Sequence, residues 1–128
     1  MSHRPRRVPA WALSLVAVVI VSGCAGKVAP PHERAEALVD KVLDAWARGE
    51  SHEQFSDPSR PLQASDPDWK DGYRLLSFLN VEAKPKEGTP DEVRCRVALS
   101  LQDRRGKAVE KEVVYAVQFG DRTVIRRE

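Results

Sequence analysis

The stretch from residue 93 to residue 119 contains two runs in which every second residue is apolar and most of the residues between are polar. The apolar positions are Val93, Cys95, Val97, Leu99 and Leu101 in the first run and Val113, Tyr115, Val117 and Phe119 in the second. Strict alternation puts one set of side chains on one face of a strand. Gly106 lies between the two runs, so the stretch predicts a β-hairpin.

The register of this hairpin follows from parity. Both apolar sets occupy odd positions, and side chains that pair across two strands share one face of the sheet. The loop must therefore hold an odd number of residues, and we expect Val97 to lie opposite Tyr115 and Leu99 opposite Val113. An even loop would place arginines against the apolar set.

Two further strands are expected, one on each side of the hairpin. Residues 73–84 predict the first, with apolar residues of one parity at Leu75, Leu79, Val81 and Ala83 and of the other parity at Leu76 and Phe78. A turn over residues 85–90 follows it. After the hairpin, Gly120-Asp121 predicts a tight two-residue turn, and residues 123–127 predict a short edge strand. Its charged end discourages pairing between sheets; binding to lipid headgroups is the second interpretation.

An amphipathic helix is expected over residues 32–48, before the first strand. Apolar residues recur there at spacings of three and four, at Ala35, Leu38, Val39, Val42 and Trp46. Glu33 in the first turn and Arg48 in the last turn match the helix dipole, and Gly49 is a typical stop. Residues 50–72 are irregular, with Ser51 as the cap of a brief helix and Asp66 as the cap of a short turn.

These elements predict an α+β fold in which one amphipathic helix packs on a curved antiparallel sheet of three to four strands. The domain is expected at residues 32–128. A tether at residues 24–31 and an N-terminal signal helix within residues 1–23 precede it. Pro30 and Pro31 favour an extended tether, which spans at most about 3.3 Å per residue.

The N-terminal segment has the layout of a secretory signal. Arg4, Arg6 and Arg7 precede an apolar run over residues 10–21, and small residues follow it. Twelve residues make a helix of about 18 Å, whereas a bilayer span needs about 20 residues, so a retained anchor helix is disfavoured. A buried core helix is disfavoured by the arginines and prolines at its start. An ordinary cleaved signal is the main rival interpretation.

The end of this segment, Val21-Ser22-Gly23-Cys24, resembles the lipobox of bacterial lipoproteins. The resemblance implies cleavage between Gly23 and Cys24 by the lipoprotein-processing enzymes. It also implies that Cys24 carries a diacylglycerol and fatty acids such as palmitate, and that membrane lipid is a partner. Ala25 after the cysteine, by the same resemblance, favours the outer membrane or the periplasmic face of the bacterial envelope.

Removal of the signal changes the charge balance. The 128-residue chain has 21 basic and 19 acidic residues, net +2. Three arginines leave with residues 1–23 and no acid does, so the mature chain carries 18 basic and 19 acidic residues, net −1. A nucleic-acid partner needs clustered Lys and Arg on a stable face, so none is expected. The 105 remaining residues suit one domain.

No cofactor or metal is expected. His32-Glu33 begins like a zinc-protease helix, but the second His would stand at position 36, which is Glu36. The acids from Asp66 to Asp71 resemble a calcium loop, but its fifth position is Lys70. Cys95 lies on the apolar face of a predicted strand, where a buried thiol is inert.

Residues 42–50, Val-Leu-Asp-Ala-Trp-Ala-Arg-Gly-Glu, are similar to the end of the first helix in nuclear-transport-factor-two-like proteins. The resemblance implies a cystatin-like sheet curved around a helix. It also raises a polyketide-cyclase-like activity. The polar pocket residues of such enzymes have no counterpart here, so no catalytic residue is carried over.

Two functions are therefore weighed. The first is a non-enzymatic, lipid-anchored module that binds an envelope protein or a small ligand, with Trp69, Tyr73 and Tyr115 as candidate binding residues. Core packing is the alternative role for these three aromatics. The second is a small hydrolase or isomerase that uses Asp68 or Asp71 beside Tyr73 as its acid or base.

Overall fold

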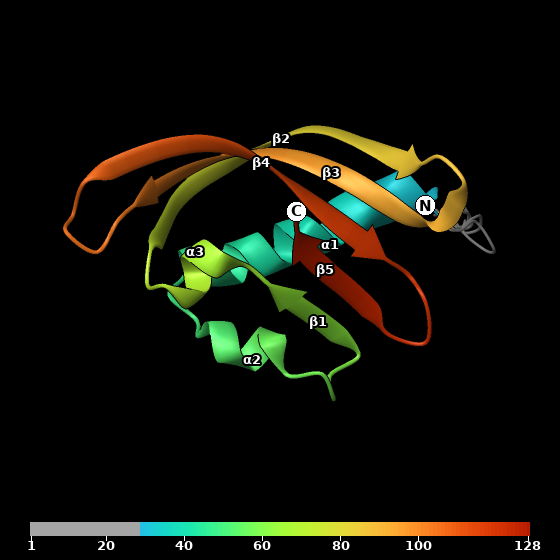
Figure 1. Ribbon diagram of the computed structural model, residues 1–128, viewed down its shortest axis with the longest axis horizontal. Coiled ribbons are helices and arrows are strands. Elements are labelled where there is room, and N and C mark those ends of the chain that lie inside the picture. Colours follow the sequence, from blue (N-terminus) through green and yellow to red (C-terminus); the bar gives the residue numbers. More distant parts are fainter. Residues whose placement is uncertain (1–28) are drawn as a thin grey trace, which may run out of the picture.

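The computed structural model describes residues 29–128, which form an α+β fold with a single mixed sheet (Figure 1). The helices are α1 (Pro31–Ala47), α2 (His52–Ser56) and α3 (Pro67–Lys70). The strands are β1 (Leu62–Ser65), β2 (Arg74–Lys86), β3 (Thr89–Gln102), β4 (Ala108–Gln118) and β5 (Thr123–Arg127). The predicted signal peptide, with Gly23 and Cys24, lies outside the described residues. Within residues 29–128, no helix combines the length and apolar character needed to cross a bilayer.

The sheet has five strands in the order β1-β5-β4-β3-β2, one more than the largest number predicted. Strands β2 to β5 pair antiparallel, as expected, but β5 is an inner strand and not the predicted edge strand, because β1 covers its free side. The additional strand, β1, pairs parallel with β5, from Leu62 opposite Thr123 to Ser65 opposite Arg126. Four residues are too few to show a period, so only the tertiary pairing with β5 defines β1 as a strand.

The amphipathic helix is confirmed as α1, and it lies across the concave face of the sheet (Figure 1). Its buried stripe is Ala35, Val39, Val42, Leu43, Ala45 and Trp46. Pro31 occupies the first helical turn, where its missing N–H costs no hydrogen bond. Gly49 adopts a φ of 89°, which glycine reaches without strain, and the helix stops there.

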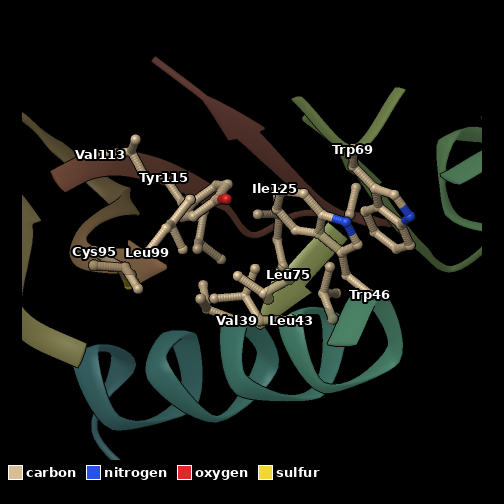
Figure 2. Packing of buried hydrophobic residues seen from close by; sticks show 14 of the residues in the cluster. Val39, Leu43, Trp46, Trp69, Leu75, Cys95, Leu99, Val113, Tyr115 and Ile125 are labelled. Carbon is tan, nitrogen blue, oxygen red and sulfur yellow. The ribbon is translucent and has the colours of Figure 1, made fainter. Parts of the chain in front are cut away.

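The core lies between α1 and the concave face (Figure 2). Strand β3 contributes its odd-numbered residues from Val93 to Leu101, and Ile125 and Ala64 extend the core to β5 and β1. Cys95 is 1 % exposed, which confirms that its thiol is buried. Burial raises the pKa of Cys95 to about 11, with the nearby carboxylates of Glu36 and Asp40 adding to the effect.

The β3–β4 hairpin has the predicted parity but a register shifted by two residues. Tyr115 lies opposite Cys95 instead of Val97, and Val113 lies opposite Val97 instead of Leu99. The loop is the reason. The side chain of Asp103 accepts hydrogen bonds from the backbone N–H groups of residues 105 and 107, both at 2.8 Å. This closes a five-residue loop directly after Gln102.

Two other turn and strand predictions need correction. The β4–β5 connection holds four residues, 119–122, instead of a two-residue turn. The N–H of Phe119 still donates to Asp91 O of β3 at 2.8 Å, so the chain stays bound to β3 for one residue after β4 ends. Strand β2 is confirmed, but it extends through Pro85 to Lys86, so the turn is shorter than expected.

Strand β2 also does not keep one apolar parity. Its register with β3 shifts between Leu75 and Ser77 and again between Asn80 and Glu82. Each shift inserts one residue, so the face reverses. Leu75 therefore faces the core, whereas Leu79 is 67 % exposed.

Candidate functional site

The most buried charged residue of the described chain is Asp66, at 3 % exposure. Asp66 is the N-cap of α3, as predicted: its Oδ1 accepts from the N–H of Asp68 at 2.7 Å and from the N–H of Trp69 at 3.2 Å. Such a cap satisfies backbone donors that a helix start leaves free. Asp66 thereby fixes the position of Trp69.

Strands β4 and β5 supply further donors to the carboxylates of Asp66 and Asp68. The hydroxyl of Tyr115 donates to Asp66 Oδ2 at 2.5 Å. Arg127 Nη1 donates to Asp66 Oδ1 at 3.1 Å and to Asp68 Oδ2 at 2.5 Å. Lys111 Nζ donates to Asp68 Oδ2 at 3.0 Å. These five residues form what we term the Asp66 network: two carboxylates, two cations and one phenol.

The charge states of the Asp66 network follow from these contacts. Burial opposes the charge of Asp68, but hydrogen bonds from Arg127 and Lys111 outweigh it and lower its pKa. Burial, and then the charge of Asp66, raise the pKa of Tyr115. Burial also disfavours the charge of Arg127, but the carboxylates outweigh it and raise its pKa. Asp68 is thus ionised and Tyr115 protonated at neutral pH, and neither is poised to exchange a proton.

His52 closes the network on the side of α2. Its Nε2 accepts a hydrogen bond from the N–H of Asp66 at 3.1 Å. Only a neutral imidazole can accept there, so the ring proton is on Nδ1. Burial lowers the pKa of His52 below its ordinary value, against the opposing charge of Asp66.

An aromatic cluster lies beside the network. The rings of Trp46 and Trp69 stack at 5.5 Å, and Phe55 lies 5.5 Å from Trp69 (Figure 2 labels both indoles). The indole N–H of Trp46 donates to Tyr73 O at 2.9 Å, and that of Trp69 donates to Glu50 O at 3.0 Å. Both donors are therefore used inside the protein.

Two neighbouring grooves border these groups. The first, of about 370 Å³, is lined by Trp46, Arg48, Ser51, Trp69, Tyr73 and Arg74, among others. The second, of about 480 Å³, is lined by His52, Ser56, Ser65, Asp66, Lys70 and Arg127, among others. His52, Glu53 and Lys70 line both. We term the first groove the Trp46 groove; its lining combines aromatic residues with charged ones.

The residues predicted from sequence do not form one site. Tyr73 is half-buried in the Trp46 groove, whereas Tyr115 is 2 % exposed within the Asp66 network. Asp68 belongs to that network, and Asp71 is exposed, with its carbonyl accepting from Arg104 at 3.3 Å. Neither carboxylate is therefore paired with the Tyr73 side chain in any hydrogen bond of the described residues.

Lys111, Arg127 and His52 were not predicted to join the site. Lys111 did carry a signal, because it is a charged residue at an odd, core-facing position of β4. Arg127 shares its face with the buried Ile125. In residues 29–128, no group of three or more His, Cys, Asp or Glu is placed to hold a metal ion. The chain matches no protein family, curated protein or solved structure among those compared.

Proposed function

We propose that this chain is a lipid-anchored protein of the bacterial envelope whose folded domain binds a partner and catalyses no reaction. The anchor is the acylated thiol of Cys24, proposed from the lipobox-like residues 21–24. Two or more acyl chains hold a protein on a bilayer stably, whereas one chain holds it only marginally. The domain follows the anchor after a short tether.

The observation that carries the binding role is that each residue of the Asp66 network is hydrogen-bonded to another residue of the network. A general acid or base needs a pKa near the working pH and access to a substrate. The pKa of Asp68 is lowered, away from neutral pH, and its Oδ2 accepts hydrogen bonds from Arg127 and Lys111. We therefore assign the network a structural role. It secures α3, and with it Trp69, to strands β4 and β5.

The binding surface in this proposal is the Trp46 groove. Tyr73 lines it and is half-buried, so its ring offers apolar area and its hydroxyl a polar contact. The ligand class that fits is a small molecule or a protein side chain with an apolar body. The fold family we propose is the nuclear-transport-factor-two-like group; the helix on a concave sheet supports it, and the parallel strand β1 is a departure from the expected antiparallel sheet.

Metabolic labelling with a palmitate analogue tests the anchor. The wild-type chain is expected to incorporate label and to fractionate with membranes, and Cys24→Ala is expected to lose both. Cys95→Ala is the matched control, since it removes the buried thiol and leaves the anchor. Equal absence of label from wild type and Cys24→Ala would refute the proposal.

A further inference from the structure

Strand β2 presents the large exposed apolar residues of the described chain. Leu76 is 50 % exposed, Leu79 is 67 % exposed and Val81 is 43 % exposed. Isolated exposed apolar residues are common, but three on one strand form a patch of the kind that marks an interaction surface. We term these three residues the β2 stripe.

The β2 stripe is produced by the irregularities of the strand. Leu76 and Val81 are the residues skipped at the two register shifts, and Leu79, opposite Ala98, points away from the core between them. The neighbouring Asn80 points the other way, because its amide donates to the Asp40 carboxylate of α1. The register and the exposure of its residues thus place the stripe on the outer face of the sheet. Helix α1 covers the opposite, concave face (Figure 1).

The charges around the β2 stripe are balanced. Glu82 pairs with Lys84 at 3.3 Å and with Arg96 at 3.2 Å. Arg96 also pairs with Glu112, at 3.4 Å. An outer face of alternating sign attracts neither a polyanion nor a polycation strongly. The apolar side chains are therefore the part of this face that favours a contact.

We infer that the β2 stripe rests on the bilayer to which Cys24 anchors the protein, so that the domain lies with its outer sheet face against the lipid. This inference depends on the proposed lipid anchor. The partner that covers the stripe is the lipid surface itself and not a second protein.

The length of the tether supports this occupant. Residues 25–30 separate Cys24 from α1 and reach about 20 Å when extended. The outer face lies about one layer spacing, roughly 10 Å, beyond the helix. Asp40, which marks the level of the stripe, is nine residues into α1, or about 14 Å along it. The bilayer is therefore within reach and at high effective concentration, so a small contact suffices.

A second copy of the chain fits the β2 stripe less well. A stable dimer buries about 800 Å² on each partner, which three partly exposed side chains bordered by ion pairs do not provide. Pairing of two β2 edges is opposed by the irregular register, since bulges interrupt the row of backbone groups that a new strand would need.

Depth-dependent fluorescence quenching tests the inference. The full lipidated protein, carrying Leu79→Cys labelled with an environment-sensitive dye, is reconstituted in phosphatidylcholine vesicles with brominated acyl chains. Acylation blocks Cys24 and burial protects Cys95, so the dye reports one position. The matched control is Glu53→Cys on α2, an exposed residue at the opposite edge of the molecule. We expect about threefold stronger quenching at position 79 than at position 53.

A second labelled variant guards against an effect of the dye. With the dye at Val81→Cys, the additional change Leu79→Glu places a charge in the stripe and is expected to lower quenching to the level of position 53. Leu79 is exposed, so the fold is unaffected, which the far-UV circular dichroism spectrum checks.

The outcomes separate this inference from the anchor on which it rests. Equal quenching at positions 79 and 53 in vesicles that carry the protein overturns the inference and leaves the anchor standing. Dye signals that change with protein density, but not with brominated lipid, show that a second copy covers the stripe and also overturn it. A protein that does not float with the vesicles refutes the anchor, and the inference falls with it.

Discussion

The hydroxyl of Tyr115 on β4 donates to the Asp66 carboxylate, 49 residues earlier in the chain, at 2.5 Å. This contact joins the cap of α3 to the centre of the sheet, and both partners are buried, Asp66 at 3 % and Tyr115 at 2 % exposure. It ties the position of α3, and of the indole of Trp69 within it, to strand β4 of the hairpin.

Tyr115→Phe tests the strength of this link. The change removes the hydroxyl and leaves Asp66 Oδ2 buried without that donor. A buried acceptor that loses its partner costs about 1–3 kcal/mol of the free energy of unfolding, measured by urea denaturation. Tyr73→Phe is the control, expected to change stability by less than about 0.5 kcal/mol because its ring is half-exposed. Equal losses for the two variants would contradict the role of the buried bond.

Arg127→Met should destabilise the domain more than Tyr115→Phe does. The arginine contacts both Asp66 and Asp68, so its removal leaves two buried carboxylates with Lys111 as the one remaining cation. Breaking a buried pair in this way costs about 3–5 kcal/mol, and solvent at the rim of the network places this case near the lower value.

The neighbouring Arg126→Met is the matched control for the arginine change. Arg126 is exposed on the outer face of β5, and replacing it with Met removes the same charge from the chain as Arg127→Met does. Its stability is expected within about 0.5 kcal/mol of wild type. If the two variants unfold at the same urea concentration, the charge pairing of the Asp66 network contributes little to the free energy of unfolding.

Stability should fall in two steps on acidification. The pKa of His52 is lowered in the folded protein, so the unfolded chain binds the extra proton first. The contribution of His52 to the free energy of unfolding is complete above about pH 6.5, the ordinary pKa of histidine. It is lost as the pH falls through the lower pKa of the folded state. The pKa of Asp68 is also lowered. Its contribution is present above the ordinary carboxylate value and is lost as pH falls through the folded value.

Urea denaturation between pH 7.5 and pH 3 measures both steps, and NMR titration of the imidazole locates the first. The charged groups that act on His52 are Asp66, Lys70 and Glu53. His52→Gln keeps an acceptor for the N–H of Asp66 but cannot titrate, so the first step should disappear while the second remains. A first step that survives this change would assign it to another group.

Reaction with a thiol reagent tests the burial of Cys95 and the acylation of Cys24 in one experiment. Cys95 is buried and its raised pKa disfavours the thiolate, so a disulfide reagent at pH 8 should react with it in the native protein at least about a hundredfold more slowly than with a free thiol. In denaturant the acylated chain should show one equivalent of reactive thiol, that of Cys95. Two equivalents would mean that Cys24 carries no lipid.

The periodic elements of this protein could be predicted from its sequence. The three- and four-residue spacing of residues 35–46 predicted α1, and the alternation of residues 93–101 predicted β3, because in both cases one face had to be apolar. Parity also predicted that Cys95 and Tyr115 would face the core. Ser51 and Asp66 were recognised as caps, since capping depends on a side chain and its next few residues.

What the amino-acid order determined by itself is therefore local: helix α1, the hairpin and the side of the sheet that is buried. The three-dimensional structure decided the hairpin register, through the loop bonds of Asp103, and the outward turn of Leu79, through the irregular pairing of β2 with β3. The parallel pairing of β1 and the meeting of Asp66 with Tyr115 and Arg127 depend on contacts between residues dozens of positions apart. Such contacts leave no period in the sequence, since each is selected only by the space and the unpaired polar groups that remain once the sheet has closed on the helix.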